Sequence, residues 1–168
     1  MQRHQIVLVA ASLILPACRA GRTVEYSVAV DPAFTADQVD AIAVAMDDWK
    51  TSVHELRVTM TIARCDSPSP QQVCIRPVHA PPDPVDDVVG TTRPGVSDSA
   101  TVWIYVDRIQ ASGSDVRALT EQTAAHELGH AMGLKHAGTG TLMATYVPQQ
   151  AQAVTAADVA QFWSVGGN

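Results

Sequence analysis

The sequence is poor in basic and in aromatic side chains. Its 168 residues include 11 lysines and arginines against 17 aspartates and glutamates, so the formal net charge is −6. No basic stripe is available to neutralise phosphates, which excludes an electrostatic nucleic-acid-binding surface. The chain has only 3 tryptophans, 3 tyrosines and 2 phenylalanines, so core packing is the simplest role for Trp49, Trp103 and Trp163.

Long hydrophobic runs are also missing. The stretch Ile6–Leu15 is predominantly apolar, but it is too short for a membrane-spanning helix, which needs about 20 such residues. Preceded by the basic Arg3, it is typical of a signal peptide. The Leu-Pro-Ala-Cys sequence that ends at Cys18 resembles the lipobox of bacterial lipoproteins. We therefore expect residues 1–17 to be removed during export.

The expected mature protein begins at Cys18, which would carry the lipid and form the sole link to a membrane. Residues 18–23 would be a tether. Residues 24–168 would be one domain, since this length is enough for a single core. These expectations place the protein in the bacterial cell envelope. The alternative is cleavage nearby without lipidation, which would give a secreted or periplasmic protein.

Cysteine is scarce, with 3 in the chain. If lipid occupies Cys18, then Cys65 and Cys74 remain as a pair in an oxidising compartment, where disulfides persist. They flank a short segment with two prolines, which indicates a small loop closed by a disulfide. The rival interpretation makes them zinc ligands, although their spacing is wider than that of the usual zinc knuckle.

The hydrophobic pattern predicts a domain of strands and helices. Alternating apolar and polar side chains indicate strands over Val24–Val30, Arg57–Ala63, Val73–Val78 and Thr101–Val106. Helical spacing indicates helices over Ala36–Lys50, Arg117–Gly133 and Thr155–Val165, the first with Thr35 as its N-cap. Residues 79–100 are rich in proline and aspartate, and we expect a loop there. A loop this long is usually functional.

The most informative segment is residues 126–136, His-Glu-Leu-Gly-His-Ala-Met-Gly-Leu-Lys-His. On a helix, His126 and His130 are four residues apart and lie on one face, so their imidazoles can converge on one ion. Gly133 can adopt a left-handed conformation that ends the helix. The chain can then return and bring in His136 as a third ligand. Three protein ligands leave one position of a tetrahedral zinc ion open for water, which is typical of a catalytic site.

Glu127 stands next to the first histidine. It can reach a metal-bound water but is not placed to be a ligand. A general base at this position is what metal-assisted hydrolysis needs. A structural zinc site would leave Glu127 unexplained and would need a fourth ligand. A surface helix with three solvated histidines is the other alternative.

This H-E-x-x-H-x-x-G-x-x-H pattern resembles the extended motif of the metzincin zinc peptidases. Within that clan, the run from His126 to Leu134 and the later Leu-Met pair are most similar to the matrixin branch. The resemblance implies that residues 140–143 form a methionine turn, with Met143 as an apolar floor beneath the imidazoles. It also implies an α+β, zincin-like catalytic domain, a small twisted mixed β-sheet with about three helices.

The function that this resemblance implies is that of a zinc-dependent endopeptidase. One catalytic zinc ion would be held by His126, His130 and His136. A zinc-bound water activated by Glu127 would hydrolyse a peptide bond in a protein or peptide substrate. Calcium is not indicated, and we expect a monomer. The alternative is a non-catalytic binding or adhesion lipoprotein on the same scaffold, and a protease with one partner as its substrate is a third possibility.

Two further segments have two interpretations each. Tyr146 lies three residues after Met143, whereas some metzincins place a zinc-binding or oxyanion-stabilising tyrosine two residues after the methionine. It is either catalytic or part of a pocket wall formed by the zinc-binding helix and Ala144–Pro148. Thr101–Val106 is either an edge strand with which a peptide could pair or an interior strand.

The roles of the acidic side chains and the histidine of the long loop also have two interpretations each. Asp83, Asp86 and Asp87 could hold calcium or form a solvated acidic turn. His79 is either an ordinary loop histidine or the ligand of a structural zinc ion. The calcium and second-zinc loops of matrixins are not recognisable in the sequence.

Overall fold

The computed structural model describes residues 23–80, 88–146 and 151–165. In chain order the elements are β1 (Val24–Val30), α1 (Ala36–Ser52), β2 (Leu56–Ile62), β3 (Gln72–Val78), β4 (Gly90–Pro94), β5 (Ala100–Tyr105), α2 (Val106–Ala111), α3 (Val116–Ala131) and α4 (Ala156–Val165). The expected α+β fold is confirmed. The predicted signal peptide and the acidic side chains of Asp83, Asp86 and Asp87 lie outside the described residues.

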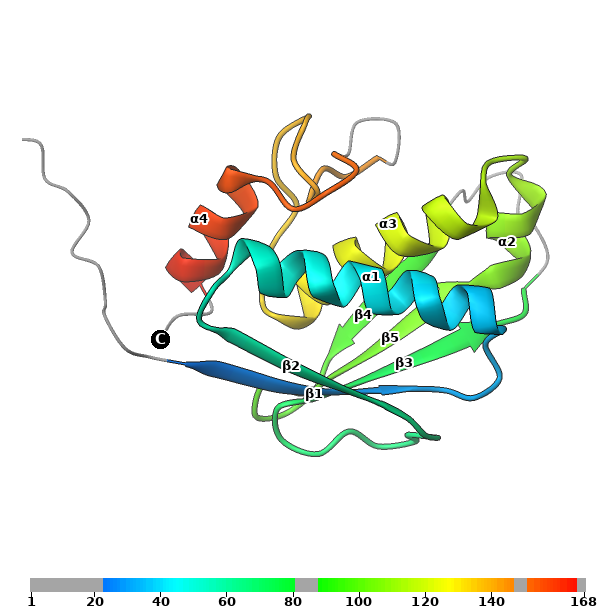
Figure 1. Ribbon diagram of the computed structural model, residues 1–168, viewed down its shortest axis with the longest axis horizontal. Coiled ribbons are helices and arrows are strands. Elements are labelled where there is room, and N and C mark those ends of the chain that lie inside the picture. Colours follow the sequence, from blue (N-terminus) through cyan, green and yellow to red (C-terminus); the bar gives the residue numbers. More distant parts are fainter. Residues whose placement is uncertain (1–22, 81–87, 147–150, 166–168) are drawn as a thin grey trace, which may run out of the picture.

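The strands form one sheet in the order β2-β1-β3-β5-β4. Strands β2, β1, β3 and β5 run parallel, whereas β4 pairs antiparallel with β5 and sets Thr91 opposite Trp103. Helices α1 and α3 lie side by side across one face of this sheet (Figure 1). Strand β4 is therefore an edge strand, and it borders α3.

Helix α1 begins with a capping box. The Thr35 hydroxyl accepts a hydrogen bond from the Gln38 amide, and the Gln38 side chain accepts one from the Thr35 amide. Thr35 is thus confirmed as the N-cap. Farther along α1, the indole N–H of the buried Trp49 donates to the Ala125 carbonyl at 2.8 Å. A side chain of α1 therefore fixes α3 one residue before the first histidine of the motif.

Two short elements differ from the sequence-based expectation. The loop predicted over residues 79–100 is wrong for Gly90–Pro94, which form β4. Glycine and proline are unfavourable inside strands, so pairing with β5 forms β4 where local propensity would not. The segment Val106–Ala111 turns into helix α2, so the last residue of the strand predicted over Thr101–Val106 is helical.

Of the two interpretations of that predicted strand, the edge strand is wrong and the interior strand is correct. Strand β5 pairs with β3 on one side and with β4 on the other. Its side chains Val102 and Ile104 are fully buried. A peptide that adds to this end of the sheet would therefore meet β4.

Cys65 and Cys74 are joined by a disulfide, as predicted. The zinc-ligand interpretation of this pair is therefore wrong. Cys74 is buried within β3. The bond ties the loop that follows β2 to the sheet.

The C-terminal helix α4 packs against α1. Phe162 and Trp49 are both buried, with ring centroids 6.5 Å apart. Trp103 and Trp163 are half-buried, and of these two only Trp163 packs against the core. The expected core role is therefore confirmed for Trp49, holds in part for Trp163 and is wrong for Trp103. Within the described part of the chain, no helix combines the length and apolar character needed to cross a bilayer.

Candidate active site

Three histidines converge near the C-terminal end of α3. His126 and His130 lie one turn apart on this helix, which ends at Ala131. Gly133 then takes a φ of 91°, a left-handed conformation that glycine adopts without strain. The chain turns back and brings in His136, so that one ring nitrogen of each histidine lies within 4.8 Å of the others. The structure thus unites the three histidines of the motif.

Backbone carbonyls orient two of these rings. The Leu142 oxygen lies 2.8 Å from Nδ1 of His126, and the Leu134 oxygen lies 2.9 Å from Nδ1 of His130. A carbonyl can only accept, so each Nδ1 carries a hydrogen and donates it. In the neutral form of each ring, Nε2 then carries no hydrogen and can act as a ligand, as is usual for metal-binding histidines.

The site favours neutral imidazoles. Burial lowers the pKa of His126 to about 4, and the neighbouring histidines act in the same direction. Burial and the proximity of His130 also lower the pKa of His136. Neutral imidazole is the form that binds metals, and three nitrogen donors suit a zinc ion with one open position. The residues present therefore fit a catalytic zinc ion.

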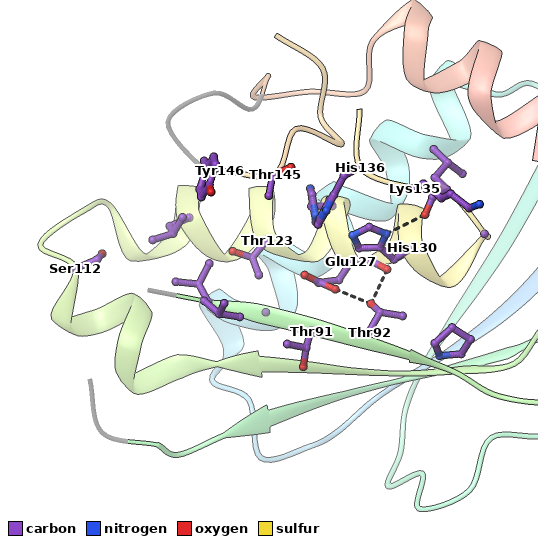
Figure 2. Close-up of a pocket in the computed structure, with 18 of the residues that line it drawn as sticks. Thr91, Thr92, Ser112, Thr123, Glu127, His130, Lys135, His136, Thr145 and Tyr146 are labelled. Atoms are coloured by element: carbon purple, nitrogen blue, oxygen red, sulfur yellow. Dashed lines mark hydrogen bonds between the residues drawn. The ribbon is translucent and has the colours of Figure 1, made fainter. Parts of the chain in front are cut away.

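Glu127 follows His126 on α3, and its carboxyl group turns toward β4 (Figure 2). It is not among the three residues whose ring nitrogens converge. Its side chain is buried, and burial raises the pKa of Glu127 to about 7, against the opposing effect of a hydrogen bond from Thr92. A carboxyl group with a pKa near neutrality can both accept and release a proton at physiological pH.

Met143 packs against α3 beside the histidines. It is fully buried, and a Cβ added to Gly129 would lie 2.4 Å from its Sδ atom and 3.1 Å from the Trp49 ring. Only glycine at position 129 lets the methionine approach the helix so closely. Leu142 precedes it and supplies the carbonyl that orients His126. The Leu-Met pair thus packs against α3 and orients one histidine of the site.

Asp158 of α4 fixes this turn from the other side. Its carboxylate accepts hydrogen bonds from the amides of Leu142 and Met143 at 3.0 and 3.2 Å, and from the Thr155 amide and hydroxyl. With 1% of its surface exposed, it is among the most buried charged residues of the described part of the chain. Sequence reasoning missed Asp158, although Thr155 and Asp158 have the Ser/Thr-x-x-Asp/Glu spacing of a helix-capping pair.

An open cleft of about 810 Å³ runs along the histidines. Figure 2 shows its walls: α3 with Thr123 and Glu127, β4 with Thr92, and the segment after the methionine turn. Thr145 and Tyr146 belong to that segment and line the cleft, as expected of a pocket wall. Ala144 of the predicted wall is buried and does not line the cleft, and the last two residues of that wall lie outside the described residues. A catalytic role of Tyr146 stays a prediction.

His79 lies elsewhere on the surface. Its Nδ1 atom is 3.1 Å from the Asp107 carboxylate, and it does not line the cleft. Across the part of the chain that the structure describes, the three histidines of the motif form the one cluster of potential metal ligands. The structural-zinc interpretation of His79 therefore has no ligand set within that part.

A family profile and one solved structure agree with this architecture. The matrixin family profile matches residues 22–165 of the chain. Curated proteins give no match. Archaemetzincin from Methanopyrus kandleri superimposes with a TM-score of 0.59 at 13% identity, over 88% of this chain and 97% of that one, which shows a shared fold. The GM1-bound form of the ECX AB5 holotoxin has a TM-score of 0.48 at 14% identity, over 83% of this chain and 70% of that one. Because the family match spans nearly the whole described domain, the chain belongs to the matrixin family of zinc peptidases.

Proposed function

We propose that this protein is a zinc-dependent endopeptidase in which Glu127 is the general base. His126, His130 and His136 would hold the single catalytic zinc ion. The observation that carries the proposal is the convergence of three histidine ring nitrogens beside a buried carboxyl group in an open cleft. A structural metal site would need neither the cleft nor the carboxyl group.

The protein's own groups divide the chemistry between them. Zinc in such a site acidifies a water molecule and polarises the scissile carbonyl. Glu127 accepts the proton of the attacking water and then delivers it to the amine that leaves. Since a nearby cation favours the ionised carboxylate, Glu127 is ready to accept that proton. The carbonyls of Leu142 and Leu134 hold His126 and His130 in the tautomer whose Nε2 carries no hydrogen, the form that binds a metal ion.

Strand β4 is the proposed docking edge for an extended peptide. It pairs with β5 on one side, and its residues Gly90, Thr91 and Thr92 line the cleft. An edge strand offers backbone donors and acceptors to an added strand. Hydrogen bonds to the peptide backbone require no particular side chain, so β4 would align substrate peptides of many different sequences. Side chains of the substrate would enter the cleft between β4, Thr123 and Tyr146.

The test compares Glu127→Gln with Glu121→Gln, the same change at a half-buried position of α3 outside the cleft. Purified protein is loaded with zinc and incubated with a peptide library, and zinc content is measured by elemental analysis. Glu127→Gln should lower kcat by about 10²–10⁴-fold, the usual contribution of general acid–base catalysis. Both variants should retain one zinc ion. Cleavage by Glu127→Gln at the wild-type rate contradicts the proposal.

Absence of cleavage by zinc-loaded wild type would favour a binding or adhesion role on the same scaffold. A protease that acts on one partner would escape a peptide library. The wild type is therefore also incubated with envelope proteins, and new N-termini are labelled. Cuts made by the wild type and not by Glu127→Gln identify such a partner, whereas identical patterns support the binding role.

We further propose that the protein is exported and lipid-anchored at Cys18 in a bacterial envelope. The support is the Leu-Pro-Ala-Cys sequence after an apolar run. Metabolic labelling with a fatty-acid analogue should mark the wild type and not Cys18→Ser. Equal labelling of both, or none, contradicts the anchor and leaves secretion or a periplasmic location.

A further inference from the structure

The edge strand β4 contacts Glu127 through a side chain that no motif contains. The Thr92 hydroxyl oxygen lies 2.6 Å from Oε2 of Glu127 and 2.9 Å from the main-chain oxygen of the same residue (Figure 2). A threonine hydroxyl has one hydrogen to donate. The carboxylate oxygen is both nearer and charged, so it is the stronger acceptor. Thr92 therefore donates to Oε2 when Glu127 is ionised.

Gly90 faces the same carboxyl group two residues earlier on β4, where strand geometry places side chains on a common face. A Cβ at position 90 would lie 2.9 Å from Cγ and 3.1 Å from Oε1 of Glu127, and 2.6 Å from Cγ2 of Thr123. A side chain at position 90 would therefore collide with Thr123 and Glu127 of α3. Glycine at position 90 thus lets β4 come close enough for the Thr92 hydroxyl to reach Glu127.

In the proposed peptidase mechanism, the contact would divide the two oxygens of the carboxylate between two tasks. A donor fixed on Oε2 restricts rotation of the carboxyl group about its last bond. Oε1 then remains to take the proton from water and return it. During this transfer the proton resides on Oε1, and Oε2 keeps accepting from Thr92 in both states. The hydrogen bond therefore persists through a proton transfer to and from Glu127.

We propose that Thr92 is a positioning residue that holds Glu127 in its reactive orientation. The inference rests on the proposed peptidase function. It predicts that loss of the hydroxyl slows turnover and leaves substrate affinity nearly unchanged, because β4 retains its backbone. It also predicts an energetic coupling between Thr92 and Glu127 that exists without metal or substrate.

The first experiment compares Thr92→Val, which removes the hydroxyl and keeps the shape, with Thr92→Ser, which keeps the hydroxyl. Thr59→Val on the far edge strand β2 is the matched control, since it makes the same change at an exposed site. For zinc-loaded enzyme, Thr92→Val should lower kcat at least 10-fold with KM within about 2-fold, as expected for loss of an oriented catalytic group. Thr92→Ser should stay within about 3-fold of wild type.

The second experiment is a double-mutant cycle on metal-free protein. Thr92→Val, Glu127→Met and the double variant are unfolded with urea and followed by circular dichroism. Thr92→Val should lower the folding equilibrium constant of the wild type about 5-fold more than it lowers that of Glu127→Met. This ratio corresponds to a coupling of about 1 kcal/mol, as expected for one hydrogen bond. Comparison within a cycle separates this contact from a general loss of stability.

The outcomes are distinct. A normal kcat for Thr92→Val, or an equally low kcat for Thr92→Ser, overturns the positioning role. Absence of coupling in the cycle overturns it as well, because a loss of activity would then arise without the contact. A wild type that cleaves nothing would contradict the proposed function, and the cycle would still decide whether Thr92 holds Glu127.

Discussion

The main-chain oxygen of Leu142 lies 2.8 Å from Nδ1 of His126. The amide of the same Leu142 donates to the Asp158 carboxylate at 3.0 Å. One peptide segment therefore connects a buried carboxylate of α4 to the first histidine of α3. The orientation of His126 depends on a residue 32 positions later in the sequence, which no metal-binding motif contains.

Replacement of Asp158 by Asn should weaken both the fold and the metal site. The carboxylate accepts from three amides and one hydroxyl, whereas an Asn side chain has one oxygen acceptor, so its NH2 group must face at least the Met143 amide, donor against donor. We expect a loss of about 2–3 kcal/mol in the free energy of unfolding, and zinc affinity lowered by about 10–100-fold, as for other outer-shell partners. Urea unfolding and competition with a zinc chelator measure these two effects.

The control for this prediction is Asp40→Asn at an exposed position of α1, which should match the wild type in both measurements. If Asp158→Asn loses stability and yet binds zinc as tightly as the wild type, the methionine turn does not transmit the position of Asp158 to His126.

Replacement of Gly129 by Ala should destabilise the protein, although alanine is the better helix former by about 1 kcal/mol. The new Cβ would lie 2.4 Å from the Sδ atom of Met143, so the methionine must move. Overpacking of this kind costs about 1–3 kcal/mol. Thermal unfolding should show a lower Tm.

A second change distinguishes crowding from other causes. Met143→Ala opens space beside Gly129, so Gly129→Ala should destabilise the Met143→Ala background less than it destabilises the wild type. Additive effects of the two changes would mean that the methionine is not the group that excludes a side chain at position 129.

The residues recognised from sequence are those whose geometry is local. His126, Glu127 and His130 share one helix, and Gly133 turns the chain toward His136 a few residues later. Helical periodicity and the conformational freedom of glycine determine these placements within eleven residues. The zinc-binding arrangement could therefore be predicted without knowledge of the sheet.

Residues that approach the site from distant segments could not be recognised in this way. Thr92 reaches Glu127 from 35 positions away, within a segment whose prolines and aspartates predict a loop. Strand β4 forms because β5 offers an unpaired edge, and no local pattern reports that pairing. For the same reason the sequence left open whether the strand containing Trp103 lies at the edge or inside the sheet.

Removal of zinc should lower stability without altering the fold. A ligand that binds only the native state stabilises it by RT ln(1 + [L]/Kd), or about 2.7 kcal/mol at 100 times Kd. Trp49 fixes α3, and backbone carbonyls hold His126 and His130, so these contacts persist without the ion.

A chelator should lower the Tm of the wild type and leave its far-ultraviolet circular dichroism unchanged. The Tm of His126→Ala should respond little, and an equal response of both proteins would place the stabilising ion elsewhere.

The stability of the metal-free protein should depend on pH in two opposing ways. Burial raises the pKa of Glu127 from 4.5 to about 7, so the folded state binds more protons than the unfolded state in that range, and stability falls as pH rises through it. Burial lowers the pKa of His126 from 6.5 to about 4, and that contribution rises over nearly the same range. The contributions of Glu127 and His126 should therefore largely cancel each other between about pH 4.5 and 6.5. Glu127→Gln removes the falling contribution, so it should gain stability over this range and exceed the wild type at pH 8 by about 1–3 kcal/mol.

Urea unfolding of chelator-treated protein at several pH values measures this difference, with Glu121→Gln expected to follow the wild type. Parallel profiles for Glu127→Gln and the wild type would show that burial does not disfavour the ionised carboxylate of Glu127.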